Sequence, residues 1–391
     1  MDSRNKKLRV LSYKPGASNE YAFALNNKLV EMGIEVLMVC DTKFDMDKYF
    51  TPFFGIRKIF FFHKRNEYFF SKGIKYFYSI VLFCLILLKF RPHIIHIQWF
   101  KFLPFEYYVF NLLKSMGFKI VFTSHDVLPA DYTERELKFY NKVYHISDVI
   151  IVHSNSTKTE ITRMFKINPE RITTIKHSNF EFIAEKYLCE KNQARRLLGI
   201  DTSAKVILFF GAIREYKGFD ILLDAFKRLK EEGNVHNLQM IVAGGGGNKF
   251  YFISDEDMRY LQATKDILYD DSFCDLDKMV QYFCASDVCV MPYRRISASG
   301  ILILAFACGK PVIVSDIGGF PEYVHDNETG YLVPLDDKKE LLNAMMKIFE
   351  NENQIRVMSE KCKEYSRNEL SWEICAEKTI SIYKGLLKKQ N

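Results

Sequence analysis

Two cations three residues apart stand where an open α/β sheet would bind a phosphate. Arg214 and Lys217 belong to the segment GAIREYKG, which follows the strand-like VILFF and precedes the helical FDILLDAFKRLK. Ligands of open α/β sheets bind beyond the carboxyl ends of the strands, and a guanidinium can bind two phosphate oxygens at once. The pair therefore predicts a diphosphate site. A surface ion pair between Lys217 and an acid is the alternative.

A second segment offers backbone donors rather than charge. Ser297, Ser299 and Gly300 precede the apolar run ILILAFACG, which is predicted to begin a helix at about Ile301. The first N–H groups of a helix have no partner within it and favour an anion. Gly300 would let a ligand approach the backbone, and Ser299 would either cap the helix or bond a phosphate oxygen. A capped helix in an ordinary Rossmann-like core would have the same pattern.

Alternating strand-like and helix-like segments must position these residues. KLRVLSY, IEVLMVCD, HIIHIQW, KIVFTSHD and DVIIVHS read as strands, and the pattern restarts with AKVILFF, LQMIVAG, DVCVMPY and PVIVSD. This alternation predicts two Rossmann-like, doubly wound α/β domains that face each other across a cleft. The expected domains are residues 1–178 and 179–391, and a last helix at about 371–389 is expected to pack back on the first domain.

Composition and short motifs indicate the class of protein, its need for a metal and its expected location. Of 391 residues, 48% are hydrophobic and 26% charged, which is typical of a globular chain with a large core. The nine cysteines have no CxxC or zinc-like spacing, and DLD at 275–277 is best read as the acidic start of a helix, so no metal is expected. The N-terminus MDSRNKKLRVLSY lacks the pattern of a signal peptide. The expected location is the cytoplasm.

The net charge of +7 is concentrated around an aromatic segment within residues 50–90. Between Arg57 and Arg91 there are eight lysines or arginines and one acid, Glu67, around IFFFHKRNEYFF and YFYSIVLFCLILL. The apolar run from Tyr76 to Leu88 would extend only about 20 Å as a helix, too short to cross a bilayer. This pattern predicts either a buried helix with solvated basic flanks or peripheral contact with the inner face of the membrane. Basic residues among aromatics do not form a recognition element for nucleic acid.

The motifs as a set resemble those of glycosyltransferase family 4, which has the GT-B fold. The resemblance rests on FFGAIREYKGFDILLDAF, IVAGGG, ASDVCVMPYRR, ACGKPVIVSDIGGFPE and TGYLVP in the second half, and on PGASNEYAFAL, HIIHIQW and TSHDVLP in the first. It implies transfer of a sugar from a nucleotide diphosphate sugar to an acceptor hydroxyl with retained anomeric configuration, without cofactor or metal. The implied acceptor is a saccharide or a lipid-linked saccharide in surface polysaccharide assembly.

The resemblance also assigns individual residues. Lys217 matches the lysine of the family's KG element, and Arg214 lies two residues after the usual arginine position. His125 matches a histidine that faces the donor sugar, with a buried structural histidine as the alternative. Gly16 and Ala17 lie where the family often has two glycines near the donor phosphate.

This chain departs from the family at two glutamate positions. Counting back from ACGKP, these positions fall on Ile296 and Leu304, which cannot accept a hydrogen bond from a sugar or a ribose. Ser297, Ser299 and Glu322 are the nearest polar substitutes. Two other functions therefore stay open: a degenerate protein that binds a nucleotide sugar without turnover, and another GT-B enzyme such as an epimerase.

Overall fold

The structure is a computed structural model, and it describes residues 7–16, 20–43, 54–61, 69–129, 132–233, 235–245 and 252–388. Three parts of the sequence predictions lie outside these residues. They are Ala17, Gly246 of the IVAGGG motif, and residues 50–53 and 62–68 of the segment expected to contact a membrane. In addition, only the backbone of 69–72 is described.

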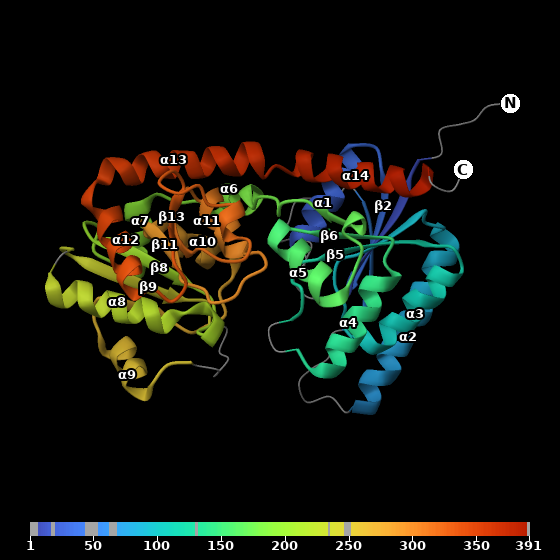
Figure 1. The fold of residues 1–391 in the computed structure, drawn as a ribbon, viewed down its shortest axis with the longest axis horizontal. Coiled ribbons are helices and arrows are strands. Elements are labelled where there is room, and N and C mark those ends of the chain that lie inside the picture. Colours follow the sequence, from blue (N-terminus) through green and yellow to red (C-terminus); the bar gives the residue numbers. More distant parts are fainter. Residues whose placement is uncertain are drawn as a thin grey trace. The chain divides into compact units, whose positions relative to one another are not determined.

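The chain divides into two compact units. The first contains Met1–Lys176 and Trp372–Asn391, and the second contains His177–Ser371. The division lies two residues before the expected boundary, and the C-terminal helix belongs to the first unit. The last helix, α14 (Trp372–Lys388), packs beside α1 (Glu20–Glu31), where Lys28 Nζ forms an ion pair with Glu373 (Figure 1).

The described part of the first unit forms one parallel sheet with strand order β3-β2-β1-β4-β5-β6-β7. The strands are β1 (Arg9–Lys14), β2 (Glu35–Asp41), β3 (Gly55–Phe60), β4 (Ile94–Ile97), β5 (Lys119–Ser124), β6 (Val149–Val152) and β7 (Ile172–Thr174). The strand order reverses between β1 and β4, which pair in register from Val10 and Ile94. Such a reversal opens a crevice at the carboxyl ends of the two strands.

Helices cover both faces of this sheet. Besides α1 and α14, they are α2 (Phe69–Phe90), α3 (Leu103–Ser115), α4 (Glu134–Ile146) and α5 (Asn155–Phe165), with a 3-10 turn η1 (Pro169–Arg171). Apolar side chains of α2, α3, α4 and α5 form one core cluster with the strands, and those of α1 and α14 form the other. The two clusters share the strands because neighbouring residues of a strand point to opposite faces.

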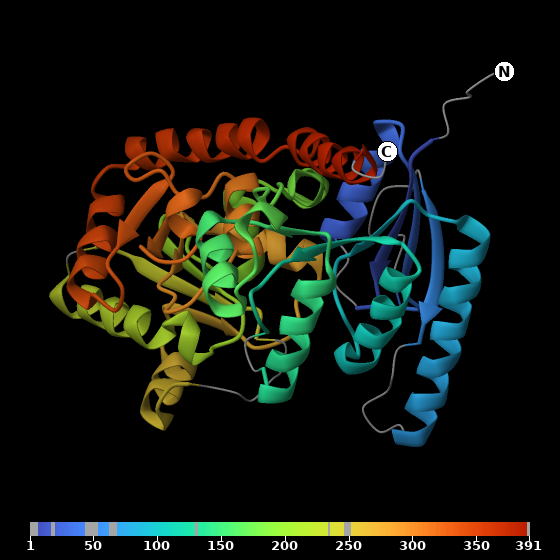
Figure 2. The same cartoon turned by 45° about the vertical axis from the view of Figure 1, so that its right-hand side comes forward.

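Helix α2 is longer than the apolar run that predicts it. It has 22 residues, drawn as a long blue helix along the first unit in Figure 2. Within the described residues, Gly73–Phe90 is long and apolar enough to cross a membrane by length and composition alone, with 28% of that window buried. The expectation that this segment is too short to span a bilayer is therefore wrong. The run of apolar letters stops at Leu88, but Lys89 and the residues before Tyr76 continue the helix.

The described part of the second unit is a second parallel sheet, with order β10-β9-β8-β11-β12-β13. Its strands are β8 (Lys205–Phe210), β9 (Leu238–Ala243), β10 (Ile267–Asp270), β11 (Val288–Met291), β12 (Val312–Ser315) and β13 (Gly330–Val333). Its helices are α6 (Glu181–Tyr187), α7 (Lys191–Leu198), α8 (Phe219–Glu232), α9 (Asp255–Ala263), α10 (Leu276–Ala285), α11 (Gly300–Ala307), α12 (Lys338–Glu350) and α13 (Glu352–Glu369), with 3-10 turns η2 (Glu215–Lys217) and η3 (Phe320–Glu322). The prediction of two doubly wound α/β domains is confirmed.

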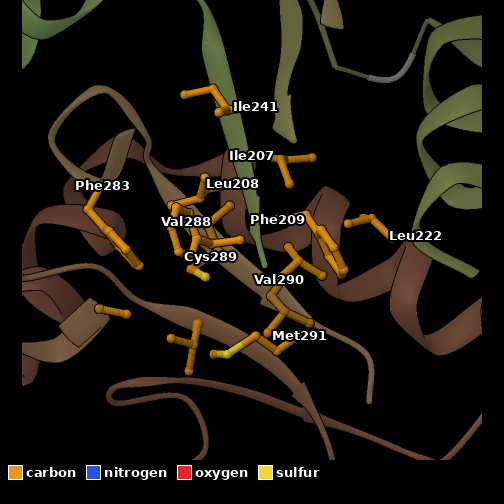
Figure 3. Close-up of a cluster of buried hydrophobic side chains, with 14 of the residues drawn as sticks. Ile207, Leu208, Phe209, Leu222, Ile241, Phe283, Val288, Cys289, Val290 and Met291 are labelled. Carbon is orange, nitrogen blue, oxygen red and sulfur yellow. The ribbon is translucent and has the colours of Figure 1, made fainter. Parts of the chain in front are cut away.

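The core of the second unit gathers around its central strands. Figure 3 shows side chains of β8 and β11, among them Ile207, Phe209 and Val290, packed with Leu222 of α8 and Phe283 of α10. Strands β8 and β11 read as continuous apolar runs because helices cover both faces of a parallel sheet. The strand order reverses between these two strands, so the loops after β8 and β11 lie side by side at a switch point.

Candidate functional site

Lys217 lies against the backbone at the end of β8. A Cβ placed on Gly211 would lie 2.1 Å from Lys217 Nζ, and Gly211 has φ +113°. Only glycine leaves room for the ammonium group there and adopts that backbone angle at low cost. Gly211 therefore leaves room for the side chain of Lys217 to fold back over the carboxyl end of β8.

The electrostatic environment of Lys217 disfavours its charge. Burial, and then the nearby charge of Arg214, lower the pKa of Lys217 to about 8. The ammonium lies 5.5 Å from the ring centroid of Tyr293, which follows β11. Among the described residues, no carboxylate lies within ion-pair distance of Lys217. The alternative interpretation, a surface ion pair of Lys217, is therefore not found among these residues. The ammonium faces an aromatic ring, which stabilises a cation less than a carboxylate does.

Arg294 anchors this loop instead of contributing a free charge. Its guanidinium donates to both carboxylate oxygens of Asp220 at 2.9 and 2.7 Å, and its Nε donates to Asp336 at 2.7 Å. It also donates to the carbonyl oxygen of Glu215 at 2.9 Å, directly in η2. These hydrogen bonds, led by those to Asp220, raise the pKa of Arg294. Two acids neutralise this arginine while it fixes the backbone of the Lys217 loop.

The loops after β8 and β11 touch through Gly218. This residue has φ +61°, and an added Cβ would lie 2.0 Å from the carbonyl oxygen of Pro292. The amide of Arg294 donates to the carbonyl oxygen of Tyr216 at 2.7 Å across the same contact. Side-by-side strands, a glycine contact and a hydrogen bond together fix the relative position of the two loops.

The helix predicted to start near Ile301 is α11. Ser299 is its N-cap, and its hydroxyl accepts from the backbone N–H of Leu302 at 3.2 Å. Gly300 is exposed, whereas Ser297 and Ile301 are half-buried. Of the two roles predicted for Ser299, helix capping and phosphate binding, the structure shows helix capping. The α11 N-terminus follows the β11 loop, so its N–H groups belong to the same edge of the sheet as Lys217.

The two positions without glutamate are used for packing. Leu304 on α11 is 2% exposed and belongs to the core cluster of the second unit, and Ile296 packs against that cluster. Glu322 lies at the end of η3, after β12. In this chain, apolar contacts occupy the two positions where the family often has carboxylates.

In the first unit, the loop after β1 brings Gly16 next to a buried lysine. A Cβ on Gly16 would lie 3.1 Å from Lys14 Nζ and 3.5 Å from Trp99. The Lys14 ammonium lies 5.5 Å from the Trp99 ring centroid, and burial lowers the pKa of Lys14 to about 8. Gly16 is thus at the β1–β4 switch point, beside a second cation of low pKa.

His125 follows β5 and is half-buried. Its ring packs edge-on against Tyr21 at 4.9 Å, and its two nitrogens lie 3.1 Å from His153 Nε2 and 3.3 Å from Gln98 Oε1. His125 thus combines partial exposure with a hydrogen-bonded ring. His93, His96 and His153 are not comparable candidates, since His96 and His153 are 1% exposed and His93 accepts from the amide of Arg9 at 3.0 Å.

Within the described residues, no group of three His, Cys, Asp or Glu side chains is arranged to hold a metal ion. Asp275, the first acid of DLD, is the residue before α10, and Asp277 lies in its first turn. This is the position at which an acid stabilises a helix.

Sequence reasoning missed Lys14, Gln98 and Tyr293. Lys14 had a visible signal, because it is a charged residue ending an apolar strand before Pro-Gly. Tyr293 had no such signal, since a tyrosine directly after a buried strand is usually a core residue. It is 2% exposed, and its hydroxyl has no hydrogen-bond partner among the residues that the structure describes.

Comparison with known proteins identifies the family of the chain. The model of the group 1 glycosyl transferases matches residues 190–369, and that of glycosyltransferase family 4 matches residues 18–177. The two matches together cover most of the chain and both units. The chain belongs to the group 1 glycosyltransferases and has their GT-B fold, with two Rossmann-like domains.

Individual relatives are more distant. A D-inositol 3-phosphate glycosyltransferase of Corynebacterium diphtheriae is 26% identical over 61% of this chain and 56% of its own length. The chain thus aligns with little more than half of that relative. A sucrose-phosphate synthase from Thermosynechococcus elongatus superposes with a TM-score of 0.75 at 21% identity, covering 98% of this chain and 100% of that one. HepE of Anabaena in complex with UDP has a TM-score of 0.72 at 15% identity, covering 97% and 100%.

Proposed function

We propose that this protein transfers a sugar from a nucleotide diphosphate sugar to an acceptor hydroxyl with retention of the anomeric configuration. Lys217 carries the proposal, because it is a half-buried cation with a lowered pKa at a switch point, and no acid among the described residues forms an ion pair with it. A cation held in this way is typical of sites where a ligand supplies the missing negative charge. A solved structural relative, HepE, is described in complex with UDP-glucose.

The proposed chemistry follows from the charge that develops in the reaction. When the bond between sugar and phosphate breaks, negative charge grows on the leaving diphosphate. Lys217, Arg214 and the N–H groups of α11 after Gly300 would stabilise that charge more strongly than the intact donor. The leaving phosphate takes the acceptor's proton, so the step needs neither a metal nor a carboxylate nucleophile. His125 and Gly16 would contact the donor from the first unit, and Ser297, Ile301 and Glu322 would line its pocket.

A donor panel tests this proposal. The protein is incubated with UDP, GDP and ADP sugars in the presence of a chelator, with and without a sugar linked to polyprenyl diphosphate, and released nucleoside diphosphate is measured. We expect release from one donor that increases with the acceptor, and an anomeric configuration in the product equal to that of the donor. Binding of a nucleotide without release would favour the degenerate protein, and interconversion of the donor sugar without acceptor would favour the epimerase.

Lys217→Ala should lower turnover roughly a hundredfold or more, as expected for the loss of one preorganised charge stabiliser. Lys361→Ala is the matched control. It removes one positive charge from an exposed ion pair with Glu328, and such pairs contribute little to stability. A near-normal rate of Lys217→Ala at saturating donor would contradict the role of Lys217.

We further propose that the protein works at the cytoplasmic face of the membrane, on a lipid-linked acceptor for a surface polysaccharide. The support lies on α2, where Tyr76, Ile80, Phe83 and Leu87 are buried and the opposite side is apolar too. Its exposed side chains include Phe77 at 62%, Leu85 at 56% and Leu88 at 65%. Exposed Lys89 and Arg91 follow at the end of the helix, and this combination suits the surface of an anionic bilayer.

Co-sedimentation with vesicles of phosphatidylglycerol and phosphatidylcholine tests the contact. Wild-type protein should bind anionic vesicles and bind pure phosphatidylcholine more weakly. Phe77→Glu with Leu85→Glu should abolish binding, whereas Leu197→Glu, at a 67% exposed position on α7, should not. Equal binding of both variants would refute a docking surface on α2.

A further inference from the structure

The loop after β4 is attached to the end of β1 and places an indole beside a lysine. Strand β1 ends at Lys14, and the amide of Gln98, the first residue after β4, donates to the carbonyl oxygen of Tyr13 at 2.9 Å. The next residue is Trp99, whose ring centroid lies 5.5 Å from Lys14 Nζ. These groups lie at the carboxyl ends of β1 and β4, where the strand order of the first sheet reverses and a ligand crevice opens.

Lys14 is a buried cation without an anionic partner. It is 8% exposed, and no carboxylate among the described residues lies within ion-pair distance of its ammonium. Burial lowers the pKa of Lys14 to about 8, and the charges of Glu20 and Asp41 oppose this effect only in part. At pH 7 the ammonium is therefore still protonated for the most part. A charge buried in this way is unfavourable until an anion pairs with it.

Asp41, at the end of β2, is engaged by other groups. Its carboxylate accepts from Lys101 Nζ at 2.7 Å and from the backbone N–H of Lys43 at 2.9 Å. Lys101 Nζ also donates to the carbonyl oxygen of Phe61 at 2.9 Å. The same unit thus provides one lysine with a carboxylate and a carbonyl oxygen, and among the described residues it provides neither to Lys14.

The surroundings of the Lys14 ammonium suit a sugar ring. A Cβ on Gly16 would lie 3.1 Å from Lys14 Nζ and 3.5 Å from Trp99 Cδ1, so a larger residue there would crowd both groups. Trp99 is half-buried, whereas its neighbours Gln98 and Phe100 are buried, so this loop leaves part of the indole exposed. The face of an indole packs well against the C–H groups that form the apolar side of a sugar ring.

We propose that Lys14 and Trp99 bind a saccharide that carries a carboxylate or a phosphate, with the ammonium pairing with the anion and the indole packing against the ring. Both anions offer the same chemistry, since their oxygens accept charge-assisted hydrogen bonds. That this saccharide is the acceptor rests on the proposed function. The proposed donor has its own cation, Lys217, in the second unit, so Lys14 serves the choice of an acidic acceptor.

Tryptophan fluorescence reports on this site directly. The chain has two tryptophans, Trp99 and Trp372 of α14, so Trp372→Phe leaves Trp99 as the single source of tryptophan emission. In this variant, glucuronate and glucose 6-phosphate should change the emission at concentrations about tenfold or more below those needed of methyl glucoside, which is neutral. Inorganic phosphate, an anion without a ring, should bind about tenfold or more weakly than glucose 6-phosphate.

Lys14→Met in the same background should abolish the preference for the anionic sugars. This change removes an unpaired buried charge, so it should not lower the midpoint of urea unfolding, in contrast to the loss of a structural ion pair. Lys119→Met is the matched control, because Lys119 is a half-buried lysine at the amino end of β5, and the preference should persist there. In transfer assays, Lys14→Met should raise KM for an acidic acceptor about tenfold and leave kcat unchanged.

Equal affinity for the neutral and anionic sugars would overturn the proposal, and so would an unchanged preference in folded Lys14→Met or no change of emission with any of the sugars. Inorganic phosphate binding as tightly as glucose 6-phosphate would also overturn it, because the site would then recognise an anion alone. Tighter binding of glucuronate would support a uronic acid, and tighter binding of glucose 6-phosphate a phosphorylated sugar. Selective binding by a protein without transferase activity would count against the proposed function and leave the site established.

Discussion

Binding of a nucleoside diphosphate should weaken as the pH rises above 8, because Lys217 loses its proton there. Burial and the charge of Arg214 lower the pKa of Lys217 to about 8 in the free protein. A diphosphate beside the ammonium opposes both effects and raises that pKa toward its ordinary value. The bound state then holds a proton that the free state has partly released, so binding above pH 8 must take up protons from the buffer.

The size of the effect follows from this pKa. If Lys217 regains its ordinary pKa in the complex, binding takes up about half a proton at pH 8 and about 0.9 at pH 9. Affinity should be nearly constant below pH 7 and fall about tenfold between pH 7 and pH 9. The nucleotide's own phosphate ionises near pH 6 and adds little to this change.

Calorimetry measures both the affinity and the number of protons taken up when buffers of different ionisation enthalpy are compared. The ligand is UDP, GDP or ADP, whichever the donor panel selects. Lys217→Arg keeps a charge that does not titrate in this range, and its affinity should be independent of pH between 7 and 9. Lys14→Arg is the matched control, since burial lowers the pKa of Lys14 to about 8 as well. The reasoning fails if wild-type binding takes up no protons at pH 8.5, or if the tenfold loss persists in Lys217→Arg and disappears in Lys14→Arg.

Two further predictions concern the second unit. Arg195→Met should destabilise it by about 3 kcal/mol or more in urea unfolding, because Asp287 would lose a buried partner at 2.9 Å; an unchanged midpoint would show that Lys191 compensates. Ser299→Ala should cost about 1 kcal/mol through loss of the α11 cap. Ser254→Ala removes the equivalent cap of α9 and should cost about as much, so weaker nucleotide binding in Ser299→Ala alone would show that Ser299 also contacts the ligand.

The sequence predicts the two sheets well because both are parallel. Strands β8 and β11 are buried on two faces and therefore appear as uninterrupted apolar runs. Each is followed by a polar loop and a helix, which is amphipathic in α8 and apolar throughout in α11. Such runs locate the carboxyl ends of the strands, and thus the Lys217 loop and the α11 N-terminus. The strand order is harder to predict from the sequence, because the pairing of β8 with β11 brings together segments about eighty residues apart.

The sequence pattern does not predict which charged side chains pair with one another. Arg294 and Lys217 are both cations after buried strands, but Arg294 is neutralised by Asp220 on α8 and by Asp336 after β13. Nothing in the local sequence around Arg294 indicates these two acids. The length of α2 was underestimated for a related reason, since lysines within an apolar helix were read as its ends.

The missing family glutamates affect the site less than their absence suggests. Leu304 is a core residue of α11, and the apolar contacts of Ile296 and Leu304 leave the cap at Ser299 and the Gly218 contact in place. The groups proposed to stabilise the leaving diphosphate are Lys217, Arg214 and the α11 N–H groups, and none of them depends on a carboxylate at these two positions. For the proposed donor, the missing contacts would be hydrogen bonds to the sugar and ribose hydroxyls, which are uncharged. Donor selectivity should therefore change more than charge stabilisation, and a pocket of this kind is compatible with turnover of a donor that the usual family pocket would not select.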